Sequence, residues 1–109
     1  MGEPSRVEQF KEVVELFPDD VVARFGLATA HLEAGEATDA IREFQTVLQM
    51  KPDYTAAYRG LGRALERANR IEEAREVYRR GISVGEQTGD LQTKKEMEVF
   101  LRRLEQRPG

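Results

Sequence analysis

Apolar side chains recur at helical spacing in six successive segments of the chain. In the first segment they are Val7, Phe10, Val13, Val14 and Phe17, which fall on one face of a helix. Spacings of three, four and seven residues are typical of amphipathic helices with one buried side. The pattern therefore predicts helices over residues 6–17, 20–34, 38–50, 54–68, 71–88 and 90–106, with no long alternating run of β-branched residues between them.

Local signals mark where the predicted helices begin and end. Ser5 with Glu8 three residues later is the capping-box pattern of a helix N-terminus. Gly35 and Asn69 follow the second and fourth helices, and both residue types accept the left-handed conformation that ends a helix. Pro18 and Pro52 stop the first and third helices. Glu86 stands at the next equivalent position, so the fifth helix is expected to run about one turn longer.

A repeat of 34 residues relates the two central helix pairs. Shifting the chain by 34 positions superposes eight identical residues, most of which are small. They are Pro18/Pro52, Asp19/Asp53, Ala23/Ala57, Gly26/Gly60, Leu27/Leu61, Ala30/Ala64, Ala34/Ala68 and Ala40/Ala74. Small residues let paired helices approach closely, and a fixed period of this length indicates stacked helical hairpins.

The residues within this period resemble the tetratricopeptide repeat. That unit is a helix–turn–helix with Trp, Leu-Gly, Tyr, Ala, Phe and Pro at fixed positions. The second unit here reads Tyr58, Leu61-Gly62, Leu65, Ala74, Tyr78 and Glu86, and the first reads Arg24, Leu27-Ala28, His31, Ala40, Phe44 and Pro52. The departures are Arg24 at the aromatic position, His31 at the Tyr position, Gly81 where Ala is usual, and Glu86 in place of Pro.

The resemblance implies an all-α fold of antiparallel helix hairpins, stacked as a short right-handed solenoid of about six helices. Residues 1–109 are then a single domain. It comprises a half repeat over 5–17, full repeats over 19–52 and 53–88, and a capping helix over 90–106. Met97, Phe100, Leu101 and Leu104 give the last helix one apolar side, and charged residues cover its other side, as the end of a stack requires.

Composition and charge narrow the functional classes. The chain has no cysteine, which excludes disulfides, thiolate catalysis and cysteine-based metal sites. It contains neither a signal sequence nor an apolar run long enough to span a membrane, so a cytoplasmic location is expected. Residues 1–54 carry a net charge of −6 and residues 55–109 a net charge of +3, which makes the molecule electrically polarised. Drift in the solvated faces is the alternative explanation of this asymmetry.

In the family the first helix of each repeat lines a concave groove, so its side chains that do not pack inward are the candidate binding residues. They are Val22, Phe25, Thr29, Leu32, Arg59, Arg63, Arg67, Lys95 and Arg102. Arg59, Arg63 and Arg67 form a single basic stripe, and guanidinium groups bind carboxylates bidentately. Two alternatives stay open: the arginines form a solvated, ion-paired face, and Phe25 packs against the preceding half repeat.

The resemblance and the arginine stripe predict a non-enzymatic scaffold that binds a peptide segment of a partner, acidic or C-terminal in character. The alternative is a structural protein that self-associates through an open N-terminal face and its oppositely charged halves. The family's full carboxylate clamp is not expected, because Phe25, Thr29 and Gly60 replace its polar residues. His31 is expected to be a packing histidine, with the acidic residues on outer faces. No catalytic residue, metal site, cofactor, nucleic acid or membrane partner is therefore predicted.

Overall fold

A computed structural model describes residues 2–107. Met1, Pro108 and Gly109, which the single-domain prediction includes, lie outside the described residues. Within the described range the backbone forms six α-helices and no strand. They are α1 (Arg6–Leu16), α2 (Val21–Glu33), α3 (Ala37–Met50), α4 (Thr55–Arg67), α5 (Ile71–Thr88) and α6 (Leu91–Glu105). The all-α prediction is confirmed, and the helix ends differ from the predicted ones by no more than one residue.

Side-chain caps fix the N-termini of three helices. The hydroxyl oxygen of Ser5 accepts a hydrogen bond from the backbone N–H of Glu8 at 3.1 Å, at the start of α1. The Oδ1 atom of Asp20 accepts from two backbone N–H groups at the start of α2, at 3.0 and 3.1 Å. Asp90 caps α6 through Thr93 in the same way. Each cap gives a partner to N–H groups that the helix itself leaves unpaired.

The turns after α2 and α4 have the same geometry although their sequences differ. Gly35 has φ of 80° and Asn69 has φ of 61°, so both adopt the left-handed conformation. In each turn the following N–H reaches back to the helix, from Glu36 to the His31 carbonyl and from Arg70 to the Leu65 carbonyl. This is the Schellman arrangement, which satisfies the last carbonyls of the helix.

Replacing Asp20 with alanine is expected to lower the free energy of unfolding by about 1 kcal/mol, because two backbone N–H groups of α2 lose their acceptor. Asp19→Ala is the matched control, since Asp19 is the adjacent acid and the cap of α2 is Asp20. Thermal unfolding followed by circular dichroism compares the two variants. Equal losses would mean that negative charge near the helix start matters and that the cap does not.

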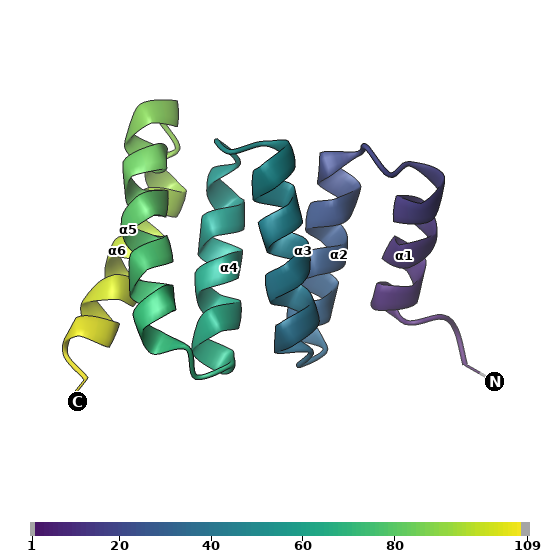
Figure 1. The fold of residues 1–109 in the computed structure, drawn as a ribbon, viewed down its shortest axis with the longest axis horizontal. Coiled ribbons are helices and arrows are strands. Elements are labelled where there is room, and N and C mark those ends of the chain that lie inside the picture. The colour runs from purple at the N-terminus through teal and green to yellow at the C-terminus, as the bar shows by residue number, and fades with distance from the viewer. Residues whose placement is uncertain (1, 108–109) are drawn as a thin grey trace.

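The helices form a row in which each one packs against its neighbours in sequence (Figure 1). The row measures 45 × 30 × 20 Å, and its two termini lie at opposite ends (Figure 1). Contacts also link α2 with α4 and α4 with α6, so the first helices of successive hairpins share one side of the row. This arrangement is the helical-repeat solenoid that the sequence predicts.

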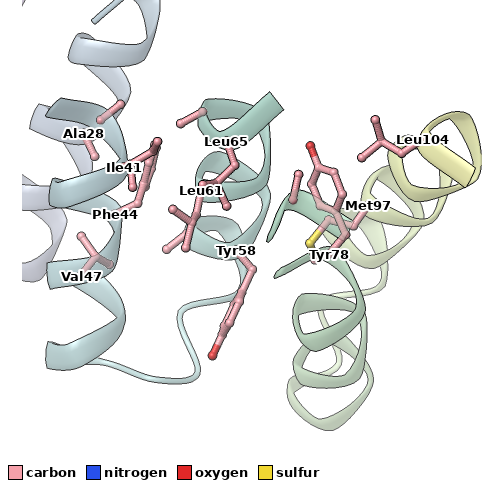
Figure 2. Close-up of a cluster of buried hydrophobic side chains, with 14 residues drawn as sticks. Ala28, Ile41, Phe44, Val47, Tyr58, Leu61, Leu65, Tyr78, Met97 and Leu104 are labelled. Carbon is pink, nitrogen blue, oxygen red and sulfur yellow. The ribbon is translucent and has the colours of Figure 1, made fainter. Parts of the chain in front are cut away.

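In the core, large side chains pack against glycines and alanines of a neighbouring helix. Phe44 of α3 lies beneath Gly60, and Tyr78 of α5 lies beneath Gly62, where a Cβ atom would overlap either ring. Ala40 and Ala74 are fully buried. Figure 2 shows the core continuing from α3, through α4, to side chains of α5 and α6. The small residues of the repeat therefore set the distance between the helices.

The two end helices, α1 and α6, differ in how much they bury. No residue of α1 is buried, and the helix is anchored by the ring of Phe10 packed over Gly26. Leu16 and Phe17 at its end are 74% and 59% exposed. By contrast, α6 buries Met97 and Leu104 completely or almost so. None of the helices among the described residues is long and apolar enough to cross a lipid bilayer.

Candidate interaction groove

A shallow depression of about 320 Å³ opens on the side that α2, α4 and α6 share. Its lining comes from all three of these helices, with Phe44 of α3 also contributing. The lining residues are Phe25, Thr29, Leu32, Phe44, Ala56, Arg59, Gly60, Arg63, Glu96 and Phe100. Five of the nine residues predicted to form the groove are in this set. The depression is the place where they come together.

Larger depressions of about 460 Å³ open elsewhere on the molecule. One lies at the turn between α4 and α5, where Arg70 forms hydrogen bonds with Glu73. Another lies between α3 and α5 and is floored by Tyr58 and Leu61, which are almost fully buried. The depression between α2, α4 and α6 differs from these because half-buried aromatic rings and arginines face it together.

One wall of the depression is aromatic. Phe25 stacks on Tyr54 with ring centroids 4.9 Å apart, and its edge meets Phe44 at 5.8 Å. Aromatic pairs favour these offset and edge-on arrangements, which hold the Phe25 ring in one position. Leu32 lies on the same helix and lines the same depression. The ring partners of Phe25 follow it in the chain, whereas the alternative expectation placed it against the preceding half repeat. One side of the ring borders the depression.

Arg59 faces the depression paired with an acid. Its Nη1 atom donates to the Glu96 carboxylate across the space between α4 and α6. About a third of each side chain is exposed, so solvent screens the pair only in part. The positive charge of Arg59 is therefore largely neutralised within the site.

Arg63, unlike Arg59, lies over an aromatic ring, that of Phe100. Its guanidinium carbon lies 4.5 Å from the centroid of Phe100, which is the geometry of a cation–π contact. The nearest carboxylate is that of Glu66, 3.8 Å away and beyond hydrogen-bond range. The guanidinium also interacts with the phenol of Tyr78, and no carboxylate among residues 2–107 lies within hydrogen-bond range of it. Its side chain is 40% exposed, so its N–H groups are available to a ligand.

Glu66 of α4 is hydrogen-bonded to Tyr78 of α5. The phenol of Tyr78 donates a hydrogen bond to Oε2 of Glu66. Burial, followed by this hydrogen bond, holds the pKa of Tyr78 well above its usual range. The phenol therefore remains a donor at any ordinary pH, and it orients the acid that lies beside Arg63. The expectation that acidic residues lie on outer faces is wrong for Glu66, and also for Glu43, which pairs with Arg24 at 3.0 Å.

The third arginine of the stripe forms a link between repeats. Nη1 of Arg67 donates to the backbone carbonyl oxygen of Leu32 at 2.7 Å, so the last turn of α4 is tied to the last turn of α2. A cation at these positions also complements the negative C-terminal ends of both helices. Arg67 therefore helps to set the spacing of the groove walls.

The remaining predicted residues lie outside the lining. Val22 is 65% exposed at the first turn of α2, and Lys95 and Arg102 are exposed on α6. The α6 residues that do line the depression are Glu96 and Phe100. Sequence reasoning assigned Phe100 to the core, where it does approach Tyr78 at 5.7 Å, and did not single out Glu96. The spacing of these two residues by four, one helical turn apart, is the signal that places both on one face.

His31 is buried on the packed side of α2, as expected. Its Nδ1 atom lies 2.8 Å from Oε1 of Glu36, and the carboxylate of Asp39 lies within 4.8 Å of both groups. Asp39 is in turn paired with Arg42 at 3.2 Å. Each member of this group thus has a protein partner, which is how a packing histidine satisfies its ring nitrogen.

Comparisons with known proteins agree on one repeat family. A family model described as tetratricopeptide repeat matches residues 7–55 and again residues 25–88. A TPR repeat-containing protein of Pseudomonas aeruginosa is 33% identical over 99 residues, which cover 91% of this chain and 94% of the relative.

Solved structures give the same result for the fold. The solution structure of a protein from Bordetella parapertussis matches with a TM-score of 0.83 and 27% identity, covering 94% of this chain and 89% of that one. The first TPR of Spaghetti (RPAP3), solved with the HSP90 peptide SRMEEVD, has a TM-score of 0.81. Its identity is 20%, covering 92% of this chain and 75% of that one, so this likeness concerns the fold alone.

Proposed function

Because this chain belongs to the tetratricopeptide repeat family, we propose that it holds a peptide segment of a partner protein in the depression between α2, α4 and α6. Domains of this family are protein-interaction modules and are generally not catalytic. The observation that carries the proposal is the pairing of an aromatic wall with an arginine whose N–H groups are available. Such a surface offers a peptide one apolar contact and one charged contact.

The apolar contact would be a side chain of the peptide placed against Phe25, Leu32 and Phe100. The lining of the depression is largely carbon, and burying apolar area contributes roughly 25 cal/mol per Å². The Phe25 ring is already fixed by Tyr54 and Phe44 before any ligand arrives. Little ordering would then be required on the protein side, which favours affinity.

The charged contact would be a carboxylate of the peptide bound to Arg63. A planar guanidinium offers two parallel N–H groups to a carboxylate, and stacking on Phe100 holds that plane still. Arg59 is a weaker candidate for binding the carboxylate, because it is already paired with Glu96. We therefore propose a ligand with one well-placed acidic group or a C-terminal carboxylate beside an apolar side chain. A long acidic run would meet Glu96 and Glu66.

The Spaghetti structure supports the idea by analogy, since the peptide in it ends in acidic residues. The contacts to the peptide carboxylate would differ in this chain. Phe25 and Gly60 stand at groove positions where the family's carboxylate clamp uses polar side chains, so Arg63 would be the main residue binding a carboxylate.

Replacing Arg63 with glutamate is expected to weaken peptide binding at least about tenfold, since a hydrogen bond to a charged group contributes roughly 1.5–3 kcal/mol. The measurement selects ligands from an array of random short peptides, then titrates the selected peptides by fluorescence anisotropy. The unchanged protein is expected to select peptides with an acidic group next to a large apolar residue. Arg63→Glu should lose them.

Two further variants sharpen the test. Arg80→Glu reverses an exposed charge on α5 outside the depression and should bind as the unchanged protein does. Arg63→Lys keeps the charge but lacks the planar guanidinium. Its affinity for the peptide should fall between those of the unchanged protein and Arg63→Glu. Selection without any acidic preference, or equal affinities for Arg63→Glu and Arg80→Glu, would place the ligand elsewhere.

A further inference from the structure

The outer face of α1 is acidic and only partly apolar. Glu8, Glu12 and Glu15 follow one another at intervals of four and three residues, so they share one side of the helix. All three are exposed, on the side away from Phe10, which packs on α2. Leu16 extends this row by a turn and is 74% exposed. Of the two basic residues of α1, Arg6 lies on another side of the helix. Lys11, three residues after Glu8 and four before Glu15, borders the acidic row.

The outer face of α6, at the other end of the row, has the opposite charge. Lys95, Val99 and Arg102 follow the same intervals of four and three residues, and Leu91 precedes them by one turn. Arg103 lies beside this row. All five side chains are exposed. Two acids of α6 lie at its flanks, where Glu96 meets Arg59 and Glu105 meets Arg79. The third acid, Glu98, is half-buried and borders the basic row, three residues after Lys95 and four before Arg102.

The charged residues on both faces are available. Among residues 2–107, no ion pair involves Glu8, Glu12, Glu15, Lys95, Arg102 or Arg103, although ten ion pairs form elsewhere. Each face carries three like charges and at least one exposed apolar side chain. Lys11 borders the acidic row and Glu98 the basic one, and the two faces still have opposite net charge.

We propose that the acidic outer face of α1 in one copy of this chain binds the basic outer face of α6 in a second copy. The exposed Leu16 of one copy would then be covered by Leu91 and Val99 of the other. The three carboxylates would face the three cations. This contact goes beyond the peptide groove and leaves the depression between α2, α4 and α6 open.

The geometry favours a head-to-tail contact over a symmetric one. The α1 and α6 helices lie at opposite ends of the row, so the two complementary faces of a single copy cannot meet (Figure 1). A symmetric contact through α1 would place acids against acids, and one through α6 would place cations against cations. A head-to-tail contact is heterologous, so copies add one after another into short open chains.

The contact is small and rests on exposed charges, so it is expected to be weak and to depend on salt. Exposed charges are screened within a few ångströms at high ionic strength. The apparent mass should rise with protein concentration in low salt and fall toward that of one chain when salt is added. The rise should show no plateau at two copies.

Charge reversal at each end tests the proposal by sedimentation velocity over a concentration series. One variant carries Glu8→Lys, Glu12→Lys and Glu15→Lys, and the other carries Lys95→Glu, Arg102→Glu and Arg103→Glu. Each variant alone has two ends of the same sign and should remain a single chain. Mixed in equal amounts, they should associate again, because every α1 face then meets an α6 face of opposite sign in the other variant.

Arg80→Glu is the control, since it reverses one charge at neither end and should associate as the unchanged protein does. Circular dichroism establishes that both variants are folded, which is expected because every altered residue is exposed. A single-chain mass for the unchanged protein at all concentrations would overturn the proposal. So would association that persists in either variant alone, or a mixture that stays dissociated.

Discussion

Replacing Tyr78 with alanine is expected to lower the free energy of unfolding by about 3–5 kcal/mol, the range for removing a buried aromatic ring. Tyr78 is fully buried, fills the space over Gly62 and approaches Phe100 at 5.7 Å. Figure 2 shows its ring between side chains of α4 and α6, so its removal opens a cavity that three helices share. Such a loss is a large fraction of the stability of a small domain.

Urea unfolding measured by circular dichroism tests this expectation, with Tyr78→Phe as the comparison. Phenylalanine keeps the ring but loses the donor to Glu66, and the loss of a hydrogen bond to a charged group should cost about 1.5–3 kcal/mol. The difference between the variants separates the ring from the hydroxyl group. If Tyr78→Ala unfolds at the same urea concentration as the unchanged protein, the ring does not occupy the core position described.

Replacing Gly62 with alanine is expected to destabilise the protein by about 1–3 kcal/mol, the usual cost of overpacking. The sign of this stability change is informative, because alanine in the middle of a helix is otherwise favoured over glycine by about 1 kcal/mol. A Cβ atom at Gly62 would overlap the ring of Tyr78, which is enclosed and cannot move aside. Packing is therefore expected to outweigh helix propensity at this position.

A double-mutant cycle makes the prediction specific to this pair. In the Tyr78→Ala background the ring is gone, so Gly62→Ala should become neutral or stabilising. Urea midpoints of the four proteins give the coupling energy between the two sites. Equal effects of Gly62→Ala in both backgrounds would show that the clash is with another group.

Most of the fold could be predicted because the determining residues act locally. Glycine, asparagine and proline end helices through their own backbone preferences, so Gly35, Asn69 and Pro52 reveal the boundaries without any knowledge of tertiary structure. The missing proline at Glu86 likewise predicts the 18-residue α5, against 14 residues in α3. The small residues recur at a fixed period, and that period is legible in the sequence alone.

The site could be predicted only in part, because its contacts cross between helices. Sequence analysis placed Phe25, Arg59 and Arg63 on one side of the array, and they do line one depression. It did not predict that Glu96 neutralises Arg59 or that Phe100 supports Arg63. Which residues of α6 face α4 depends on how α6 is rotated after the longer α5. Packing determines that rotation, and the 34-residue repeat pattern carries no signal for it.

The row of helices has a consequence for how the chain folds. Each helix packs on its sequence neighbours, and contacts beyond them among the described residues are confined to α2 with α4 and α4 with α6. Proteins with such local contacts close only short loops during folding and reach the native state quickly. Stacked repeats can also nucleate at any hairpin and grow outward. With one neighbour and no buried residue, α1 is the last segment to be consolidated and the first to open, so stability is graded along the row.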